Sequence, residues 1–172
     1  MSHDGPPEDQ FARQHGIVKW NTEGWWGHEW HPAWIIDPTL DQIKELIQPH
    51  CHHCGLESEE LSVRFLKEGM WDMLYILSSS DPESELSGEY VLRIALPVDP
   101  WYKTQSEVAT MEYVRQHSTI PVPRVYAFDS SGNNSLALEW ILMQKIEGKS
   151  YSEISESLCF DARKELHRTI AD

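Results

Sequence analysis

One residue of this sequence places a permanent charge inside an apolar run. Arg93 lies within Tyr90-Val-Leu-Arg-Ile-Ala-Leu-Pro97, where most of its neighbours are aliphatic. If a strand with this composition is buried, its guanidinium needs an anionic partner. The alternative is that Arg93 is a solvated residue on an exposed face of the strand. We favour the first interpretation, which requires a carboxylate nearby.

Glu107 stands in the segment Lys103-Thr-Gln-Ser-Glu-Val-Ala-Thr110, near the start of an expected helix. Two roles are open for it. Thr104 and Glu107 have the spacing of a capping box, in which the glutamate bonds back to the amide of the cap residue at a helix start. The same carboxylate could instead pair bidentately with an arginine. Both roles could hold in different states of the protein.

Histidines and cysteines cluster in His50-Cys-His-His-Cys54. A Cys-x-x-Cys pair supplies two ligands for tetrahedral zinc, and neighbouring imidazoles could add more. A structural zinc site usually takes its second pair from a distant part of the chain, and here Cys159 stands alone. We therefore expect no metal site, and a zinc-binding module is the rival interpretation of this cluster. The odd total of 3 cysteines also argues against a disulfide framework.

The period of the hydrophobic residues predicts the elements that position these side chains. Alternation with period two is typical of half-buried strands, and apolar residues three or four apart are typical of helices. The expected strands are 61–65, 73–77, 90–96, 125–128 and 136–143, and the expected helices are 40–47, 103–117 and 161–170. Asp37 or Thr39 could cap the first of these helices.

The N-terminal part of the chain is dense in tryptophan. It holds Trp20, Trp25, Trp26, Trp30 and Trp34. Glycines and prolines between them exclude a long helix. Since aromatic rings carry a large apolar area, we expect this stretch to wrap over the core of the chain itself.

The composition limits the classes of partner. With 28 acidic and 14 basic residues the formal net charge is −14, which disfavours nucleic acid and anionic membranes as partners. No apolar run is long enough to cross a bilayer, and the first residues lack the features of a secretory or transit peptide. The chain is expected to be intracellular, and cytoplasmic rather than in an organelle.

Four motifs in this order resemble the aminoglycoside phosphotransferase (APH-like) family, and most of all its fungal branch. They are Tyr90–Pro97, Lys103–Thr110, Ile120-Pro-Val-Pro123 and Glu139-Trp-Ile-Leu-Met143. The resemblance implies an α+β fold, the small lobe of the protein-kinase-like fold, with a five-stranded antiparallel sheet and one helix. It divides the chain into a Trp-rich extension (1–60), the small lobe (61–147) and a linker with the first helix of a truncated large lobe (148–172).

The resemblance also implies a nucleotide site. In kinases a basic side chain on the third strand holds the ATP phosphates and is fixed by a glutamate of the next helix. Here these are Arg93 and Glu107. Gly69 would lie in the loop that covers the phosphates, although Asp72 departs from the family pattern and should weaken ATP binding. The adenine would bind the backbone at Met143, Gln144 and Lys145, and Mg²⁺ would bind only together with ATP.

The catalytic base and the metal-binding residues of such folds lie beyond the hinge, in the large lobe. The only histidine after the hinge is His167, and it is not followed by a catalytic-loop motif. We therefore expect these residues to be inactive by themselves, as a truncated enzyme or a pseudoenzyme. The alternative is a non-enzymatic interaction module that associates with itself or another protein through the uncovered lobe interface.

Overall fold

The computed structural model describes residues 18–21, 31–34, 36–56, 61–79 and 88–171. Its strands are β1 (Val18–Asn21), β2 (His31–Trp34), β3 (Leu61–Glu68), β4 (Asp72–Ser79), β5 (Tyr90–Ala95), β6 (Val125–Asp129) and β7 (Glu139–Gln144). Its helices are α2 (Leu40–Ile47), the 3₁₀ helix η1 (Gln48–Cys54), α3 (Tyr102–His117), α4 (Tyr151–Ile154) and α5 (Phe160–Ala171).

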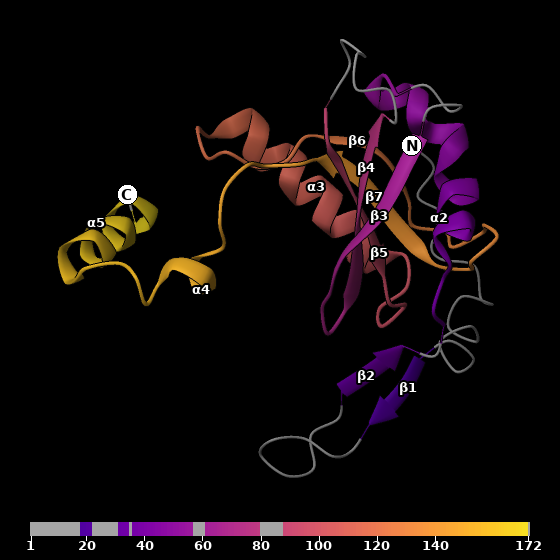
Figure 1. Cartoon of the computed structure of the whole chain (residues 1–172), viewed down its shortest axis with the longest axis horizontal. Helices are drawn as coiled ribbons and strands as arrows, with labels where there is room; N and C mark the ends of the chain where they lie inside the picture. Colours follow the sequence, from indigo (N-terminus) through magenta and orange to yellow (C-terminus); the bar gives the residue numbers. More distant parts are fainter. Residues whose placement is uncertain (1–17, 22–30, 35, 57–60, 80–87, 172) are drawn as a thin grey trace.

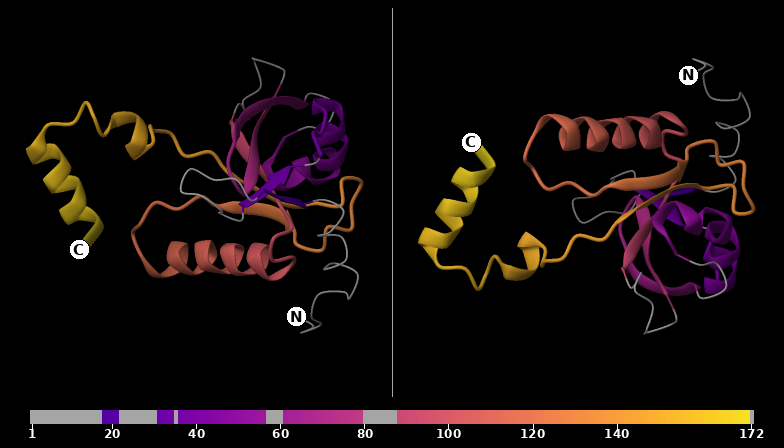
Figure 2. Two further views of the ribbon diagram at one scale, coloured as in Figure 1. Left: turned by 90° about the horizontal axis from the view of Figure 1, so that it is seen from below. Right: turned by 90° about the horizontal axis from the view of Figure 1, so that it is seen from above.

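The centre of the molecule is a five-stranded sheet of order β3-β4-β5-β7-β6, in which every neighbouring pair is antiparallel (Figure 1). This arrangement confirms the sheet and the fold class expected from the sequence. The helix α3 runs beside β6 and β7, and α2 with η1 lies on the other side of the sheet (Figure 2). The sheet is therefore the layer that separates the two groups of helices.

The main hydrophobic core lies between the sheet and α2 with η1. Its fully buried residues include Ile43, Ile47, Cys51, Leu77, Leu92 and Leu142. Thr39 caps α2 with a complete capping box, so of the two expected caps Thr39 is the one used. Apolar residues at alternate strand positions face this core, because side chains of a strand alternate between its two faces.

The opposite face of the sheet turns toward α3 and carries the charged residues. Strand register places Arg93 beside Leu74 and Ile141, and it places Ala95 between Asp72 and Glu139. Residues two apart on a strand point to the same side. Arg93, Asp72 and Glu139 therefore share one face of the sheet.

Two sequence expectations are wrong in detail. The last strand begins at Glu139 rather than at Leu136, because 134–138 form a turn in which Ala137 has a φ of 55°. The short helix α4 lies where a linker was expected. The helix expected over 161–170 is confirmed and spans Phe160–Ala171. Both helices lie apart from the sheet, beyond an extended segment (Figures 1 and 2).

The N-terminal stretch contains a small antiparallel pair, β1 with β2, which the sequence reading did not identify. Trp34 is half-buried and packs against the main core, as expected of a wrapping segment. Trp25, Trp26 and Trp30 lie outside the described residues.

Candidate functional site

The guanidinium of Arg93 lies between carboxylates from two elements. Its Nη2 donates to Glu107 Oε2 of α3. Its Nε lies 3.8 Å from Asp72 Oδ2 at the start of β4. The side chain of Arg93 is only 17% exposed, so the sequence expectation of a partly buried cation with a carboxylate partner holds. Burial lowers the pKa of Arg93, and the charge of Asp72 opposes that shift.

Glu107 is held by a second cation from its own helix. Lys103 Nζ lies 3.5 Å from Glu107 Oε1, one helical turn earlier. Burial lowers the pKa of Lys103, and the positive charge of Arg93 lowers it further. Glu107 therefore faces two basic groups that both lie close to the sheet.

The capping-box role considered for Thr104 and Glu107 is wrong. The helix α3 begins at Tyr102, and its N-cap residue is Trp101. Thr104 is thus inside the first turn and fully buried. A capping box requires its Ser or Thr to stand at the cap position itself. Of the two roles left open for Glu107, the ion pair with Arg93 is the one that forms.

Glu139 adds a third carboxylate to this face. It is 4% exposed, and its Oε1 accepts the backbone N–H of Trp101 at 2.7 Å. Burial raises the pKa of Glu139, while the Thr104 side chain, the Trp101 amide and the charge of Lys103 oppose the shift. A carboxylate from β7 therefore reaches the start of α3.

The cluster offers hydrogen-bond donors to an anion. Within the described part of the chain, neither Arg93 Nε nor Lys103 Nζ has a hydrogen-bond acceptor, and both atoms are buried. Buried donors normally have acceptors, so these two have unused capacity for a phosphate oxygen. Asp72, Glu107 and Glu139 balance the positive charge and limit the net attraction for an anion.

Gly69 begins the turn between β3 and β4. Its amide donates to the carbonyl of Asp72 at 2.8 Å. A Cβ at position 69 would lie 2.8 Å from Asp72 Oδ1. The absence of a side chain on Gly69 thus lets the Asp72 carboxylate fold over the turn toward Arg93, and the turn stands next to the charged cluster.

The expected hinge residues lie at the end of β7 and just beyond it. Met143 is 9% exposed, and the Gln144 amide donates to the Arg124 carbonyl at 2.8 Å. Lys145 Nζ lies 2.6 Å from Glu89 Oε2, and this contact ties the segment to the residue just before β5. The structure brings Arg93 and Glu107 together, and it places Gly69 on an adjacent turn and Met143, Gln144 and Lys145 further along the sheet.

The histidine and cysteine cluster has a structural explanation. Cys51 and Cys54 are buried in η1, and their thiols lie within hydrogen-bond distance of the carbonyls of Ile47 and Cys51. Among the described residues, no group of three or more His, Cys, Asp or Glu side chains could hold a metal ion. The cysteines thus serve the packing of η1.

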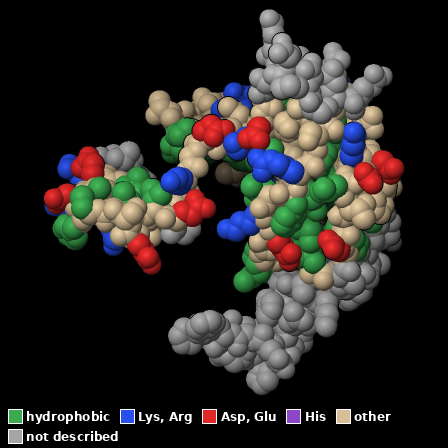
Figure 3. Space-filling view, in the orientation of Figure 1, with side chains coloured by type: hydrophobic (Ala, Val, Ile, Leu, Met, Phe, Trp, Pro, Cys, Tyr) green, Lys and Arg blue, Asp and Glu red, His purple; other side chains and the backbone are tan. Residues whose placement is uncertain are grey.

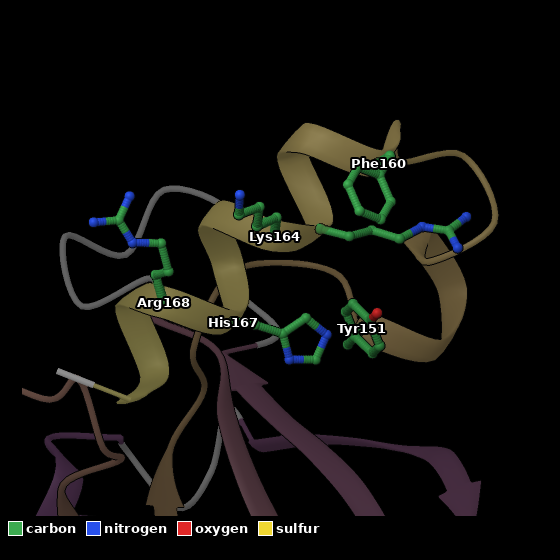
Figure 4. A pocket seen from close by; sticks show the side chains of 6 residues that line it. Tyr151, Phe160, Lys164, His167 and Arg168 are labelled. Atoms are coloured by element: carbon green, nitrogen blue, oxygen red, sulfur yellow. The ribbon is translucent and has the colours of Figure 1, made fainter.

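A separate hollow of about 650 Å³ lies between α4 and α5. Its lining is aromatic and basic: Tyr151, Phe160, Arg163, Lys164, His167 and Arg168 (Figure 4). These helices stand away from the sheet in Figure 2. None of the lining residues belongs to the Arg93 cluster. No described helix is long and apolar enough to cross a bilayer.

Sequence reasoning missed Lys103 and Glu139 as members of the charged cluster. Lys103 lies four residues before Glu107, a spacing that puts both on one helix face, and this signal was available. Glu139 gives no such signal, because its contact with Trp101 joins residues 38 positions apart in the sequence.

Comparison with known proteins places this chain in one protein family. The model of the phosphotransferase enzyme family (APH) matches residues 79–172. Subtelomeric hrmA-associated cluster proteins of two Aspergillus fumigatus strains are each 35% identical over 109 residues, which is 62% of this chain and 20% of theirs. The mitochondrial protein "altered inheritance of mitochondria protein 9" of Debaryomyces hansenii is 34% identical over 91 residues, 51% of this chain and 14% of that protein. No solved structure matches this chain significantly.

Proposed function

This chain belongs to the phosphotransferase enzyme family, and on that premise we propose that it supplies the ATP-binding half of a small-molecule phosphotransferase. The region that matches this chain is 20% of the length of the Aspergillus relatives. The proposal therefore concerns what the described residues contribute, and the phosphate acceptor is left open.

The contact between Arg93 and Glu107 is the observation that carries the proposal. In kinase folds a strand cation holds the ATP phosphates, and a carboxylate of the next helix orients that cation. Arg93 on β5 and Glu107 on α3 have this relation. An arginine keeps its charge at any physiological pH and can contact two phosphate oxygens at once. Lys103, with its Nζ 3.5 Å from Glu107, brings a second positive charge to the same side of the sheet.

The remaining nucleotide contacts follow from the order of the elements. The phosphates would lie under the turn at Gly69, and the adenine would bind the backbone of Met143, Gln144 and Lys145. The Gln144 amide already donates to Arg124, so other backbone groups of this segment would serve the base. Mg²⁺ would bind through the phosphates of ATP, and we assign no residue of the chain to it.

We further propose that these 172 residues by themselves bind nucleotide without transferring phosphate. Phosphoryl transfer needs a positioned base and metal ligands, which supply most of the electrostatic stabilisation. His167 is the only histidine beyond the hinge. It is exposed on α5 and lies against Tyr151, with 6.0 Å between the ring centroids.

Calorimetric titration of the purified chain with Mg-ATP tests the proposal. We expect weak binding, with a dissociation constant in the millimolar range, and at least about tenfold weaker binding in Arg93→Ala, because the substitution removes a charge-assisted contact. Arg115→Ala is the matched control, since Arg115 is exposed on α3 and pairs only locally with Glu112. Equal heats for wild type and Arg93→Ala would exclude the assigned site.

Self-association is a second candidate function, favoured by exposed apolar side chains at and beyond the hinge. Ile146, Tyr151 and Phe160 are 47%, 45% and 79% exposed. Figure 3 shows hydrophobic side chains on the surface of this part of the chain. Apolar groups exposed together favour association. Light scattering of the purified chain tests for self-association. A dimer that the substitution Phe160→Ser dissociates would support this function, and a monomer at all concentrations would exclude it.

A further inference from the structure

The helix that carries Glu107 makes several polar contacts with the sheet and with neighbouring segments. Of the residues of α3 whose burial is described, only Thr104 is fully buried. A helix usually docks through an apolar stripe. Here the described polar contacts are Glu107 with Arg93, Gln105 Nε2 with Ser130 Oγ at 2.8 Å, and the Trp101 amide with Glu139. These hydrogen bonds act together with the half-buried Val108, Met111 and Val114, and they are concentrated at the start of α3.

The start of α3 has an unusual backbone. Trp101 has a φ of 71° and a ψ of −54°, and the Tyr102 amide donates to the Pro100 carbonyl at 2.9 Å. This is a γ-turn of the strained kind, which residues with a Cβ seldom adopt. No side chain of its own segment caps the helix. Such strain persists where the surrounding structure imposes it.

Glu139 is the side chain that accepts the amide at the centre of this turn. Its carboxylate, 4% exposed and 38 positions away in the sequence, accepts the Trp101 amide at 2.7 Å. A carboxylate at a helix start also interacts favourably with the helix dipole. Glu139 belongs to β7, which pairs directly with β5, the strand of Arg93. One rigid pair of strands thus fixes both the start of α3 and the cation that Glu107 must reach.

We infer that Glu139 is a positioning residue: by accepting the Trp101 amide it holds the start of α3 so that Glu107 meets Arg93. That Glu139 positions the start of α3 follows from the contacts above. That it thereby affects ATP binding rests on the proposed function. The effect of Glu139 passes through the Trp101 amide and the first two turns of α3.

The test is amide hydrogen exchange of 101–107 in wild type, Glu139→Gln and Glu139→Met. Both variants remove the charge, but only glutamine keeps an oxygen that can accept the Trp101 amide. We expect exchange about tenfold faster in Glu139→Met and less than about threefold faster in Glu139→Gln, as local opening follows the loss of one hydrogen bond. Amides of β4 serve as the internal control and should not change.

Wild-type rates in Glu139→Met, or equal acceleration in both variants, would overturn the inference. If Glu139→Met does not fold, the same exchange measurement is made on Trp101→Gly and Trp101→Ala, in which Glu139 is unchanged. Glycine takes a positive φ without strain. The α3 amides of Trp101→Gly should therefore exchange several-fold more slowly than those of Trp101→Ala. Equal rates in these two variants would also overturn it.

ATP titration of the same variants separates this inference from the proposed function. Weaker ATP binding in Glu139→Met than in Glu139→Gln is expected if both are right. If wild type binds no ATP, the proposed function fails, while the exchange rates still decide the role of Glu139.

Discussion

Arg93 and Asp72 lie on neighbouring strands, and Arg93 Nε is 3.8 Å from Asp72 Oδ2 while the other end of the guanidinium contacts Glu107. The arginine therefore stands between two carboxylates of different origin. Glu107 orients the guanidinium from the helix. Asp72, which lies at the end of the turn that begins at Gly69, competes with any anion that approaches Nε.

This competition predicts that Asp72→Asn tightens ATP binding. Removing a like charge beside the phosphates should gain about two- to fivefold in affinity, the range of a partly exposed ion pair. Calorimetric titration with Mg-ATP at fixed ionic strength measures it. Glu112→Gln is the matched control, because Glu112 pairs with Arg115 further along α3. A weaker affinity in Asp72→Asn would show that the carboxylate helps to bind the nucleotide.

The raised pKa of Glu139 predicts that the stability of the folded chain depends on pH. Burial raises its pKa above the ordinary value of 4.5, so between these two values the folded chain binds more protons than the unfolded chain. The contribution of this group is therefore fully present below pH 4.5 and is lost as pH rises through the raised pKa. Glutamine does not titrate, so Glu139→Gln should gain stability relative to wild type as pH rises from 4.5 toward neutrality.

Denaturant unfolding of both proteins at several pH values measures this difference. A stability gap between wild type and Glu139→Gln that stays constant across the range contradicts a raised pKa. Glu112→Gln is again a useful control, since a hydrogen bond from Arg115 lowers the pKa of Glu112 and its effect should have the opposite sign.

The three cysteines should differ in reactivity. Burial, with Cys54 nearby, raises the pKa of Cys51 to about 11, and burial raises that of Cys54. Cys159 is exposed. Because the thiolate is the reactive form, a disulfide reagent should modify Cys159 quickly in the native protein and the other two only after unfolding. Rapid labelling of native Cys159→Ser would show that η1 opens readily.

The sheet was predictable because its residues carry a strong local signal. Leu61, Val63 and the run of 90–96 follow the pattern of strands, and Pro121 and Pro123 require extended backbone before β6. The start of β7 was not predictable in the same way. Leu136 and Leu138 are buried as strand residues would be, but the Asn134 side chain bonds the Leu138 carbonyl and closes a turn. Burial and strand structure give the same hydrophobic pattern there.

The candidate site was predictable only in part. Arg93 and Glu107 were identified because of the resemblance to a known family, and the need of a buried cation for a partner favoured a functional role for Arg93. The failure at Thr104 has a local cause: the helix begins two residues earlier, at a γ-turn held by Glu139. Neither Glu139 nor the backbone of Trp101 could be inferred from local sequence. Strand pairing places Glu139 opposite Ala95, and the path of the chain from Ala95 to Trp101 completes the contact.

NMR chemical-shift perturbation of the labelled chain by Mg-ATP locates the bound nucleotide. We expect the shifts to concentrate at Gly69, at Arg93 with its neighbours on β5, and at 143–145, and we expect Arg93→Ala to reduce them at all three places. Shifts confined to α4 and α5, or no shifts at saturating nucleotide, would contradict this expectation.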